Sequence, residues 1–463
     1  MSDFDLIVIG AGPAGMSAAR TAACGGLQVL LLDEQERPGG QIYRNVGRNR
    51  SSYKWLGKDY AAGSRLVDGL VHPGVTAQFR ATVWRLDSGP RVVWSQDGAS
   101  HITAAPHVVL AGGAQERPVP FPGWTFPGVM TAGAAQILMK TAGMLPQGAV
   151  LAGSGPLLYL VAAQMIDAGC PPKALVETQT PRMMLGALPC LPKAVFAAPT
   201  LLKGLGLIRK LRAAGVRRYA ATSGFKATTD ASGMIHFSFR FKGRQQSLTC
   251  ALLLTHQGVI PSTHTSRAAG IRHEWNAAQV AFQPVHDIWG ATDQPGLHVA
   301  GDGAGIGGAE AAAATGELAA LNILHVTGRI SADNRNQRAA NARATLFRAR
   351  AIRPFLDAAY QPPAEILSPP DDTVICRCEE VTASAIRQGM SEGAQGHRQI
   401  KTSLRVGMGA CQGRMCDATV RGILSAGKAS RMGRIDPPRA RSPIKPIALG
   451  ELATLVNDQE ETA

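Results

Sequence analysis

The stretch Asp5-Leu-Ile-Val-Ile-Gly-Ala-Gly-Pro-Ala-Gly15 decides the fold. Its four consecutive apolar residues, 6–9, predict a short buried strand that runs directly into a glycine-rich turn. The small residues of 14–24 then predict a closely packed helix, and the apolar run of residues 28–33 predicts a second strand. A strand, a turn, a helix and a strand in this order form a βαβ unit, which indicates a parallel sheet.

Each glycine of this turn has a physical reason to be glycine. Gly10 allows the tight turn, Gly12 lets the backbone approach a pyrophosphate, and Gly15 lets the helix pack close to the strand. Asp33 ends the second strand, where a carboxylate can bind ribose hydroxyls. A glycine turn without a ligand is the alternative, and the complete βαβ context argues against it. The predicted dinucleotide site comprises Gly10, Gly12, Pro13, Ala14, Gly15, Asp33 and Glu34.

The same pattern begins again at Gly148. The run Ala149-Val-Leu-Ala-Gly-Ser-Gly155 is again a strand followed by glycines, residues 157–168 predict a helix, and residues 173–177 predict the next strand. This internal repeat predicts a second dinucleotide-binding unit inserted within the first, which resumes near Phe282.

Two interpretations of the second unit stay open. Gly153 and Gly155 are in place, but Leu158 stands where a third glycine belongs. Because Glu177 is well placed for a ribose, Gly153, Gly155 and Glu177 form a candidate site for NAD or another adenine nucleotide such as ATP. The alternative is a structural copy whose site has decayed. The third glycine serves packing more than phosphate contact, so the sequence does not decide between them.

The eight cysteines fall into two groups. Four of them stand singly among apolar neighbours, as small buried hydrophobic residues do: Cys24, Cys170, Cys190 and Cys250. The other four form a Cys-x-Cys pair, Cys376 and Cys378, and a Cys-x4-Cys pair, Cys411 and Cys416. Four thiolates can hold zinc or a [2Fe-2S] cluster, and neither pair has the Cys-x2-Cys spacing that zinc ribbons favour.

Short strings around the first unit resemble the two-dinucleotide-binding-domain flavoproteins, the glutathione-reductase-like group. These strings are Pro38-Gly-Gly-Gln41 and Ala300-Gly-Asp302, and the resemblance covers residues 1 to about 330. It implies FAD in the first unit, with Asp302 bonded to the ribityl chain and a helix from residues 307–309 aimed at the flavin pyrimidine edge. The implied flavin contacts are Gly40, Gln41, Ala111, Gly112, Gly301, Asp302, Gly308 and Ala309. No Cys-x-x-Cys occurs in the sequence, so no dithiol is present for a disulfide reductase.

The cysteine segment resembles the bacterioferritin-associated-ferredoxin-like (BFD-like) [2Fe-2S] domain. The resemblance is carried by Cys376-Arg-Cys-Glu-Glu-Val-Thr382 and by Gly407-Met-Gly-Ala-Cys-Gln-Gly-Arg-Met-Cys416. It implies a [2Fe-2S] cluster on Cys376, Cys378, Cys411 and Cys416. Arginines near the cysteines would raise the potential of a cluster, with a solvated surface as the alternative: Arg377, Arg405 and Arg414.

The whole chain resembles the alpha-type subunit of dye-linked, heteromeric amino-acid dehydrogenases. This family includes the opine (octopine and nopaline) oxidases, D-hydroxyproline dehydrogenase and hydrogen cyanide synthase. The strings that carry it are residues 39–44, 115–124, 128–133 and 301–308. The resemblance implies a flavin-containing, D-amino-acid-oxidase-like beta subunit that oxidises a C–N bond. Electrons would then pass through flavin and cluster to a quinone or an artificial dye. It further suggests a small ferredoxin-like gamma subunit, together with an FMN at the interface between subunits.

We therefore expect an α/β protein with two Rossmann-like, glutathione-reductase-like domains and a small helical BFD-like [2Fe-2S] domain. The expected boundaries are 1–120 and 281–330 for the FAD-binding domain, 121–280 for the inserted NAD-like domain, 331–371 for a linker, 372–430 for the BFD-like domain and 431–463 for a basic, proline-containing tail.

The formal net charge of +15 raises the question of a nucleic-acid partner. Lysine and arginine are spread along the chain and no nucleic-acid-binding motif occurs, so we expect none. An acidic partner subunit or anionic lipid headgroups suit the charge better. The acidic start and the short first apolar run do not suggest a signal peptide, and no run of eighteen apolar residues lacks Gly, Pro or charge. We expect a cytoplasmic protein, with a peripheral position at the inner face of the cytoplasmic membrane as the alternative.

No pair of carboxylates or histidines marks a substrate base. The histidines near predicted strand ends are typical of structural histidines: His256, His264, His286 and His298. Core packing is the simpler role for the aromatic residues Tyr43, Trp124 and Trp289, although each is a candidate to flank a flavin. Two other functions stay open: a self-sufficient NAD(P)H-dependent reductase, which needs nicotinamide in the inserted domain, and a non-enzymatic iron–sulfur carrier or sensor.

Overall fold

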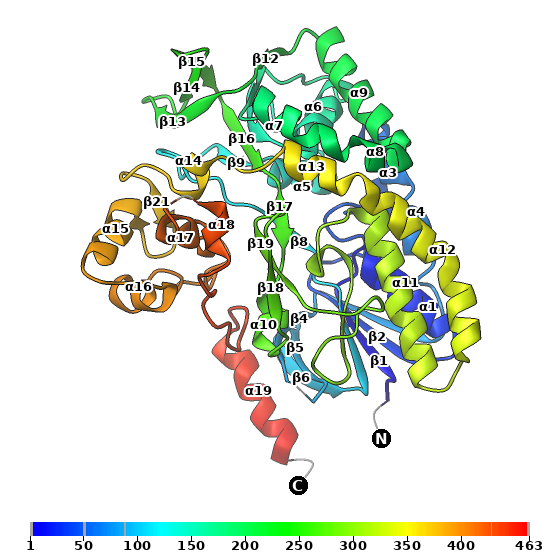
Figure 1. Cartoon of the computed structure of the whole chain (residues 1–463). Helices are drawn as coiled ribbons and strands as arrows, with labels where there is room; N and C mark the ends of the chain where they lie inside the picture. Colours follow the sequence, from blue (N-terminus) through cyan, green and yellow to red (C-terminus); the bar gives the residue numbers. More distant parts are fainter. Residues whose placement is uncertain (1–2, 50–51, 88, 427, 461–463) are drawn as a thin grey trace.

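The structure is a computed structural model that describes residues 3–49, 52–87, 89–426 and 428–460 (Figure 1). Its first domain is built on a parallel sheet with the strand order β20-β7-β1-β2-β3. The strands are β1 (Leu6–Ile9), β2 (Val29–Asp33), β3 (Val75–Phe79), β7 (His107–Leu110) and β20 (Leu297–Val299). The expected βαβ unit is β1, helix α1 (Pro13–Cys24) and β2, with β1 at the centre of the sheet.

Both faces of this sheet are buried, because successive side chains of a strand point to opposite faces. Leu6 and Val8 face α1 and the long helix α11 (Ala309–Val326). Ile7 faces an antiparallel sheet made of β4 (Thr82–Leu86), β5 (Arg91–Gln96) and β6 (Ala99–Ala104). Short helices connect β2 to β3: α2 (Val46–Asn49), α3 (Lys58–Ala61) and α4 (Ser64–Asp68).

The inserted domain repeats the plan with the strand order β12-β11-β10-β16-β9, all parallel. Its strands are β9 (Val129–Thr131), β10 (Ala149–Ser154), β11 (Ala174–Glu177), β12 (Arg217–Tyr219) and β16 (Leu252–Gln257), and its first helices are α5 (Ala132–Ala142) and α6 (Pro156–Asp167). A meander of β13 (Ser223–Thr229), β14 (Ile235–Phe241) and β15 (Arg244–Cys250) is attached to it. Leu158 is buried in the core between α6 and the sheet, so the missing glycine is replaced by packing. The α/β class with two Rossmann-like domains is confirmed.

Two antiparallel strands, β8 (Ala114–Glu116) and β17 (Val259–Pro261), carry the chain out to the inserted domain and back, and we call this connection the crossover. After β17, helix α10 (His264–Ala268) leads to Ala269 and Ile271, which pack in the core beneath β4. The chain therefore returns to the first domain before residue 281, where we expected the boundary. A hairpin of β18 (His273–Asn276) and β19 (Ala281–Pro284) then leads to β20.

The segment expected to be a linker is packed against all three domains (Figure 1). Helix α12 (Ala332–Ala351) runs along α11, α13 (Arg353–Ala359) lies on the inserted domain, and α14 (Ala364–Leu367) lies against the cysteine domain. Trp289 lies between the guanidinium groups of Arg335 and Arg343, 4.2 and 4.6 Å from its ring centroid. We call residues 331–371 the brace.

The cysteine domain is small and mostly helical. It contains β21 (Val374–Cys376), β22 (Val381–Thr382), α15 (Ala383–Ser391), α16 (His397–Leu404) and α17 (Asp417–Leu424), around its own apolar core. The C-terminal tail continues through α18 (Ala429–Met432) and an extended stretch to α19 (Leu449–Glu460). Helix α19 packs on β6, and the amide of Ser100 donates to Oγ1 of Thr454 at 2.9 Å. The tail thus spans from the cysteine domain to the first domain.

A further helical excursion connects β11 to β12. It comprises α7 (Pro181–Ala187), α8 (Leu191–Ala194) and α9 (Ala198–Ala213), joined by short 3-10 turns at 188–190 and 195–197. By length and composition alone, Pro181–Ala213 is long and apolar enough to cross a membrane. Three prolines lie inside it, at 189, 192 and 199, each near the start of a helical segment, so the chain forms successive helical segments.

The contact between α1 and α11 gives a test of the packing. A Cβ on Gly316 would lie 2.0 Å from the carbonyl oxygen of Ala14, whereas a Cβ on Gly204, also helical, would meet no atom within 4 Å. We expect Gly316→Ala to lower the free energy of unfolding by roughly 1–3 kcal/mol. The control Gly204→Ala should be neutral or raise it by up to about 1 kcal/mol. Urea denaturation measures the free energy of unfolding of both variants. Equal values for Gly316→Ala and Gly204→Ala would contradict the close packing of α1 on α11.

Candidate functional site

The first glycine turn cannot accommodate side chains at two of its glycines. A Cβ on Gly10, which has φ +105°, would lie 2.6 Å from the carbonyl oxygen of Ala111, and one on Gly15 would lie 1.8 Å from that of Gly10. Gly40, from the Pro-Gly-Gly-Gln string, lies against the glycine turn: a Cβ on Gly40 would be 2.8 Å from Cα of Gly12. The structure therefore brings these predicted residues together at the end of β1. Gly12 caps α1 without a side chain, which leaves the helix N-terminus open to a phosphate.

Two carboxylates lie at the end of β2. Asp33 accepts from the amide of Ala11 at 2.6 Å and from the amide of Gln35 at 2.7 Å, so it fixes the glycine turn. Burial raises the pKa of Asp33. Glu34 forms an ion pair with Lys445, which comes from the C-terminal tail. Sequence reasoning missed Lys445, because nothing local to it indicates a partner so far away along the chain.

The predicted flavin end lies around Asp302. Its Oδ1 accepts from the amides of Gly307 at 2.8 Å and Gly308 at 2.9 Å, which fixes the turn that starts α11 at Ala309. A Cβ on Gly301 would lie 2.8 Å from the Cβ of Ala14, so Gly301 packs directly against α1. In the same region, a Cβ on Gly303 would lie 3.8 Å from the carbonyl carbon of Gly112. The N-terminus of α11 favours negative charge at this point.

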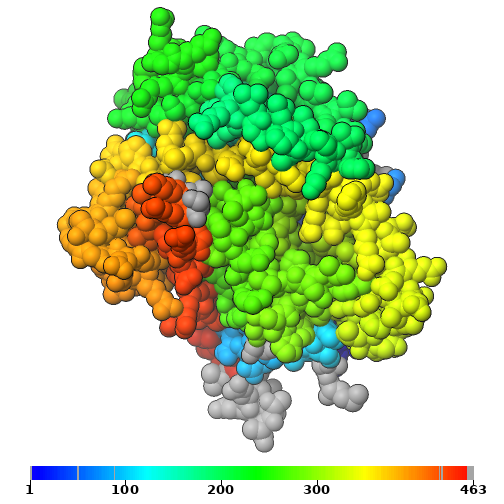
Figure 2. Space-filling view, viewed as in Figure 1, coloured from blue at the N-terminus to red at the C-terminus, as the bar shows by residue number. Residues whose placement is uncertain are grey.

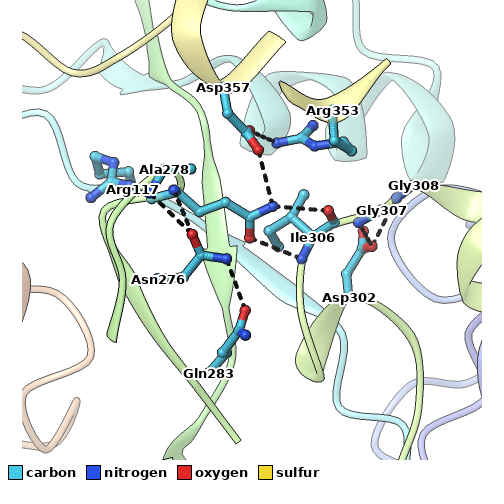
Figure 3. A network of polar contacts seen from close by, with 11 residues as sticks. Arg117, Asn276, Ala278, Gln283, Asp302, Ile306, Gly307, Gly308, Arg353 and Asp357 are labelled. Carbon is cyan, nitrogen blue, oxygen red and sulfur yellow. Dashed lines mark hydrogen bonds and ion pairs between the residues drawn. The ribbon is translucent and has the colours of Figure 1, made fainter. Parts of the chain in front are cut away.

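A hydrogen-bond network fixes the loop between Asp302 and Gly308 (Figure 3). At its centre, the side-chain amide of Gln279 donates to the carbonyl of Ile306 at 3.0 Å and accepts from the amide of Ile306 at 3.2 Å. Arg117, directly after β8, donates to the carbonyl of Gln279 at 2.7 Å. Burial and the charge of Arg421 lower the pKa of Arg117 to about 10. The crossover strand and the β18–β19 hairpin therefore both position the loop.

These residues fit a flavin dinucleotide in physical terms. A side-chain-free turn meets the end of helix α1, carboxylates lie at the end of β2, and a second helix N-terminus lies beyond Asp302. The turn suits the phosphates, the carboxylates suit ribose hydroxyls, and the second helix N-terminus suits the ring of a flavin. The adenine end would be held near Asp33 and Glu34, and the flavin end near Gly308 and Ala309.

Lys140 on α5 is a buried cation beside this site. Its Nζ donates to the carbonyl of Gln41 at 3.0 Å and to Oε1 of Gln136 at 2.8 Å. Burial, with a contribution from the charge of Arg44, lowers the pKa of Lys140 to about 7. Lys140 therefore changes its charge near neutral pH next to Gln41, whose side chain is exposed.

The second glycine turn keeps its backbone shape. Gly153 has φ +131° and Gly155 has φ +121°, and a Cβ on Gly153 would lie 1.8 Å from the carbonyl oxygen of His256. The ring of His256 is held by Glu116, with Nδ1 and Oε1 2.6 Å apart. Glu116 also accepts from the amide of Gly133 at 2.9 Å. His256 therefore has the structural role expected for it.

Glu177, the predicted ribose ligand of this unit, has protein partners for both oxygens. Oε1 accepts from the hydroxyl of Tyr159, and Oε2 accepts from Arg218 at 2.8 Å. The side chain of Glu177 is 4% exposed, and Tyr360 of the brace lies close enough for Glu177 to raise its pKa, after the larger effect of burial. A ribose would have to displace these groups. The arrangement favours the interpretation of the second unit as a structural copy.

The four clustered cysteines lie close together in two pairs. The thiols of Cys376 and Cys416 form a hydrogen bond, and those of Cys378 and Cys411 form another. A Cβ on Gly409 would lie 2.1 Å from Cβ of Cys378, so the backbone closes tightly around the thiols. Within the described residues, no three His, Cys, Asp or Glu side chains surround a point suited to one metal ion.

The surroundings of Cys376 favour a thiolate. A hydrogen bond from Cys416 and backbone amides of Gly407, Glu379 and Cys378 lower the pKa of Cys376 to about 5, although burial opposes this. The hydrogen bond from Cys416 to Cys376, together with burial, raises the pKa of Cys416. Amide donors around sulfur and four adjacent thiols suit an iron–sulfur cluster.

The predicted arginines near the cysteines differ in their contacts. Arg377 lies over the ring of Trp124, at 5.3 Å, and Arg405 pairs with Glu379 at 3.0 Å. Arg414 lies between Cys411 and Cys416 and donates to the carbonyl of Cys411 at 3.3 Å. Arg414 therefore contacts the backbone of a predicted cluster ligand, whereas the contacts of Arg377 and Arg405 are with other side chains.

The cysteine domain is attached directly to the first domain and the crossover. Gln115 of β8 donates to the carbonyl of Arg414 at 2.9 Å, and Trp124 donates to the carbonyl of Val374 at 2.6 Å. The side chain of Arg421 lies over the rings of Trp275 and Phe282, at 5.6 and 4.9 Å. Trp124 thus has an interdomain role and does not flank the predicted flavin site.

Buried charges line the same boundary. Burial alone would raise the pKa of Asp417, but Arg421, His397 and Arg267 outweigh it and lower that pKa. Asp417 accepts from Arg421 at 2.8 Å. A cavity of about 50 Å³ lies here between α17 and β17, lined by Arg267, Arg421 and Arg414 among others. The domain boundary is polar and basic.

The C-terminal tail contacts both predicted cofactor sites. Pro443 accepts from the side chain of Gln412 at 2.7 Å, and Ile444 accepts from Arg414, both in the cysteine loop. The next residue, Lys445, pairs with Glu34 at the first glycine turn. Residues 443–445, expected to be part of a basic tail, therefore connect the two predicted cofactor sites.

Replacing Lys140 with Met tests its buried charge. The pKa of Lys140 is about 7 in the folded chain and 10.5 in the unfolded chain, so between these values the unfolded state binds more protons and stability rises with pH. We expect the free energy of unfolding of Lys140→Met to rise less with pH over this window than that of the wild type. Lys226→Met, at an exposed position, is the control and should follow the wild type. Parallel curves for Lys140→Met and wild type would contradict the assignment.

The cysteine assignment is tested by single replacements. Cys376→Ala, Cys378→Ala, Cys411→Ala and Cys416→Ala should each lose bound iron and acid-labile sulfide, because each thiolate is one ligand of the cluster. Cys24→Ala should keep both, because Cys24 lies outside the cysteine domain, at an exposed position and not in the core as expected. Iron and sulfide analysis of anaerobically purified protein measures the change. Full iron and sulfide in all four variants would exclude these ligands.

Comparison with known proteins assigns both kinds of domain to known families. Residues 4–317 match the family described as pyridine nucleotide-disulphide oxidoreductase, and residues 374–426 match the BFD-like [2Fe-2S] binding domain. The chain is 44% identical to the A subunit of opine oxidase from Agrobacterium tumefaciens (strain Ach5), over 98% of this chain and 92% of that protein. It is 32% identical to the hydrogen cyanide synthase subunit HcnB of Pseudomonas aeruginosa, over 97% of this chain and 98% of that protein.

Among solved structures, the L-proline dehydrogenase of P. horikoshii has a similar fold. Its TM-score is 0.70 at 20% identity, with 97% of this chain and 79% of that chain covered. The resemblance found in the sequence motifs is thus confirmed over nearly the whole chain. The chain belongs to the pyridine nucleotide-disulphide oxidoreductase family and, within it, to the family of the opine oxidase A subunits, with a BFD-like [2Fe-2S] domain at residues 374–426.

Proposed function

We propose that this chain is the electron-transfer subunit of a multisubunit FAD-dependent dehydrogenase that oxidises the C–N bond of an opine or a related D-amino or imino acid. Electrons pass from flavin to the [2Fe-2S] cluster and on to a quinone, or to an artificial dye in an assay. The observation that carries the proposal is the hydrogen bond from Gln115 to the carbonyl of Arg414, because it fixes the cysteine loop against the first nucleotide-binding domain.

The spacing along the chain supports this role. Gln115 follows the predicted flavin contacts Ala111 and Gly112 by only a few residues, and Arg414 lies between two of the cysteines. A flavin accepts two electrons and a [2Fe-2S] cluster accepts one, so a chain that holds both can divide electron pairs. The protein supplies the fixed position of one centre relative to the other.

The substrate is proposed to bind elsewhere, on a flavin-containing beta subunit of the D-amino-acid-oxidase-like kind. Two of the histidines near strand ends have structural partners: His256 contacts Glu116, and His264 contacts Gln412 at 3.2 Å. The opine oxidase and hydrogen cyanide synthase relatives are both named as subunits, which supports a hetero-oligomer. The proposal further includes a small ferredoxin-like gamma subunit, together with an FMN at the interface.

The higher identity to the opine oxidase relative favours an opine over glycine as the substrate of the complex. A stand-alone NAD(P)H-dependent reductase is the second candidate, and it requires a nucleotide in the inserted domain. The contacts of Glu177 with Tyr159 and Arg218 weigh against that requirement. ATP or NAD in this domain remains a prediction.

Reconstitution tests the proposed function. The chain alone should not reduce a dye with octopine, nopaline, D-hydroxyproline or glycine, whereas the chain purified with its partner subunit should do so with an opine. NADH should not bleach the flavin of the isolated chain in a stopped-flow experiment. Rapid bleaching by NADH, or dye reduction by the chain without a partner, would contradict the proposal and favour the stand-alone reductase.

A further inference from the structure

The excursion formed by α7, α8 and α9, residues 181–213, has an apolar face that the described part of the chain leaves uncovered. Its exposed apolar side chains are Met184, Leu185, Leu188, Val195, Phe196, Leu202 and Leu205, each at least 36% exposed. Only 17% of the most apolar eighteen-residue window of this stretch is buried. A helix in the core of a domain would be mostly buried, so these side chains face outward.

The inward face of the excursion is already in use. Leu211 is buried in the core of the inserted domain, and Ala194 and Ala197 pack against Ile352 of the brace. The exposed apolar side chains lie outside these packed contacts, so they are not needed to hold the helices in place. Figure 2 shows the excursion at the surface above the brace, blue-green beside yellow.

The apolar face extends onto the brace. Phe347 of α12 is 61% exposed, and its ring lies 5.6 Å from that of Phe196. Two exposed phenylalanines in contact, from elements far apart in the sequence, make a continuous apolar area. We call residues 181–213 together with Phe347 the apolar face.

The charged side chains of the excursion are all basic. Residues 178–216 contain no Asp or Glu, and they contain six basic residues: Arg182, Lys193, Lys203, Arg209, Lys210 and Arg212. Lys203 and Lys210 pair with Asp59 and Asp167. Among the residues that the structure describes, the other four have no ion-pair partner and are exposed. On α9, Leu202 and Leu205 share a side with Arg209 and Arg212, because the four are spaced at helical intervals.

Apolar side chains beside unpaired basic ones complement an anionic lipid surface. The apolar groups can enter the boundary between headgroups and acyl chains, while long basic side chains reach the phosphates. The stretch does not suit a span, since prolines divide it and Lys193 and Lys203 interrupt its apolar runs. A protein partner that binds this face would need its own acidic and apolar surface.

We propose that the apolar face docks the chain on an anionic phospholipid membrane, lying in the interface without crossing it. Leu185, Phe196, Leu202 and Leu205 enter the lipid, and Arg182, Lys193, Arg209 and Arg212 contact headgroups. The proposal goes beyond the electron-transfer function and does not depend on it. If the proposed function and the proposed docking both hold, docking brings the chain to the lipid phase, in which quinones dissolve.

Vesicle flotation of the full chain tests the proposal. We expect binding to vesicles of phosphatidylcholine mixed with phosphatidylglycerol, weaker binding to pure phosphatidylcholine, and a decrease with added salt. The combined variant Leu185→Ser, Phe196→Ser, Leu202→Ser and Leu205→Ser should lose binding. The control, Val71→Ser with Ile288→Ser, removes exposed apolar side chains elsewhere and should bind like the wild type.

The basic residues are tested separately. Replacing Arg182, Lys193, Arg209 and Arg212 with Gln should weaken binding to anionic vesicles by about a hundredfold or more, since each basic residue near such a surface contributes about fivefold. Leu202→Trp offers a readout that does not depend on a loss of folding. Its fluorescence should shift to the blue with anionic vesicles and be quenched by brominated lipid.

Two outcomes would overturn the proposal. One is no binding of the wild type to anionic vesicles, and the other is equal binding by the wild type and the combined Ser variant. If the wild type does not bind vesicles and the Ser variant fails to assemble with the flavin-containing partner subunit, the face is a subunit interface. None of these assays uses substrate or dye, so their failure is distinguishable from failure of the proposed function.

Discussion

The structure depends on one constraint: the cysteine loop must stay fixed relative to the first glycine turn. The hydrogen bond from Gln115 to the carbonyl of Arg414 helps to fix it. Two redox centres in one chain exchange electrons usefully only when the protein holds them at a set separation. Gln115 lies on β8, just after the predicted flavin contacts, and Arg414 lies inside the Cys-x4-Cys loop. A shift of either element would change the path between the two sites.

Several parts of the chain maintain this separation from different sides. Trp124 binds Val374 from the crossover, Arg421 packs on Trp275, and residues 443–445 join the cysteine loop to Glu34. The brace packs on all three domains. Segments that look like a linker and a basic tail in the sequence therefore hold the domains together. Such a design suits the proposed role, in which the chain transfers electrons and a partner selects the substrate.

Sequence reasoning predicted the features whose cause is local. The βαβ unit, the glycine turn and the four clustered cysteines each depend on residues close together in the chain, and the structure brings them together as expected. It missed Lys445, Arg117 and Tyr360, because their roles come from contacts between distant segments. The role suggested for Glu177 came from its position at the end of a strand, and that position could not reveal Tyr159 and Arg218 as its partners.

Anaerobic reductive titration of the isolated chain tests the central claim most directly, with flavin absorbance and the paramagnetic signal of the reduced cluster followed together. Two centres in one polypeptide predict a two-electron flavin transition and a one-electron cluster transition, in equal amounts per chain. A chain that takes up only the electrons of a flavin, or that holds zinc on its clustered thiols and no sulfide, would contradict the account.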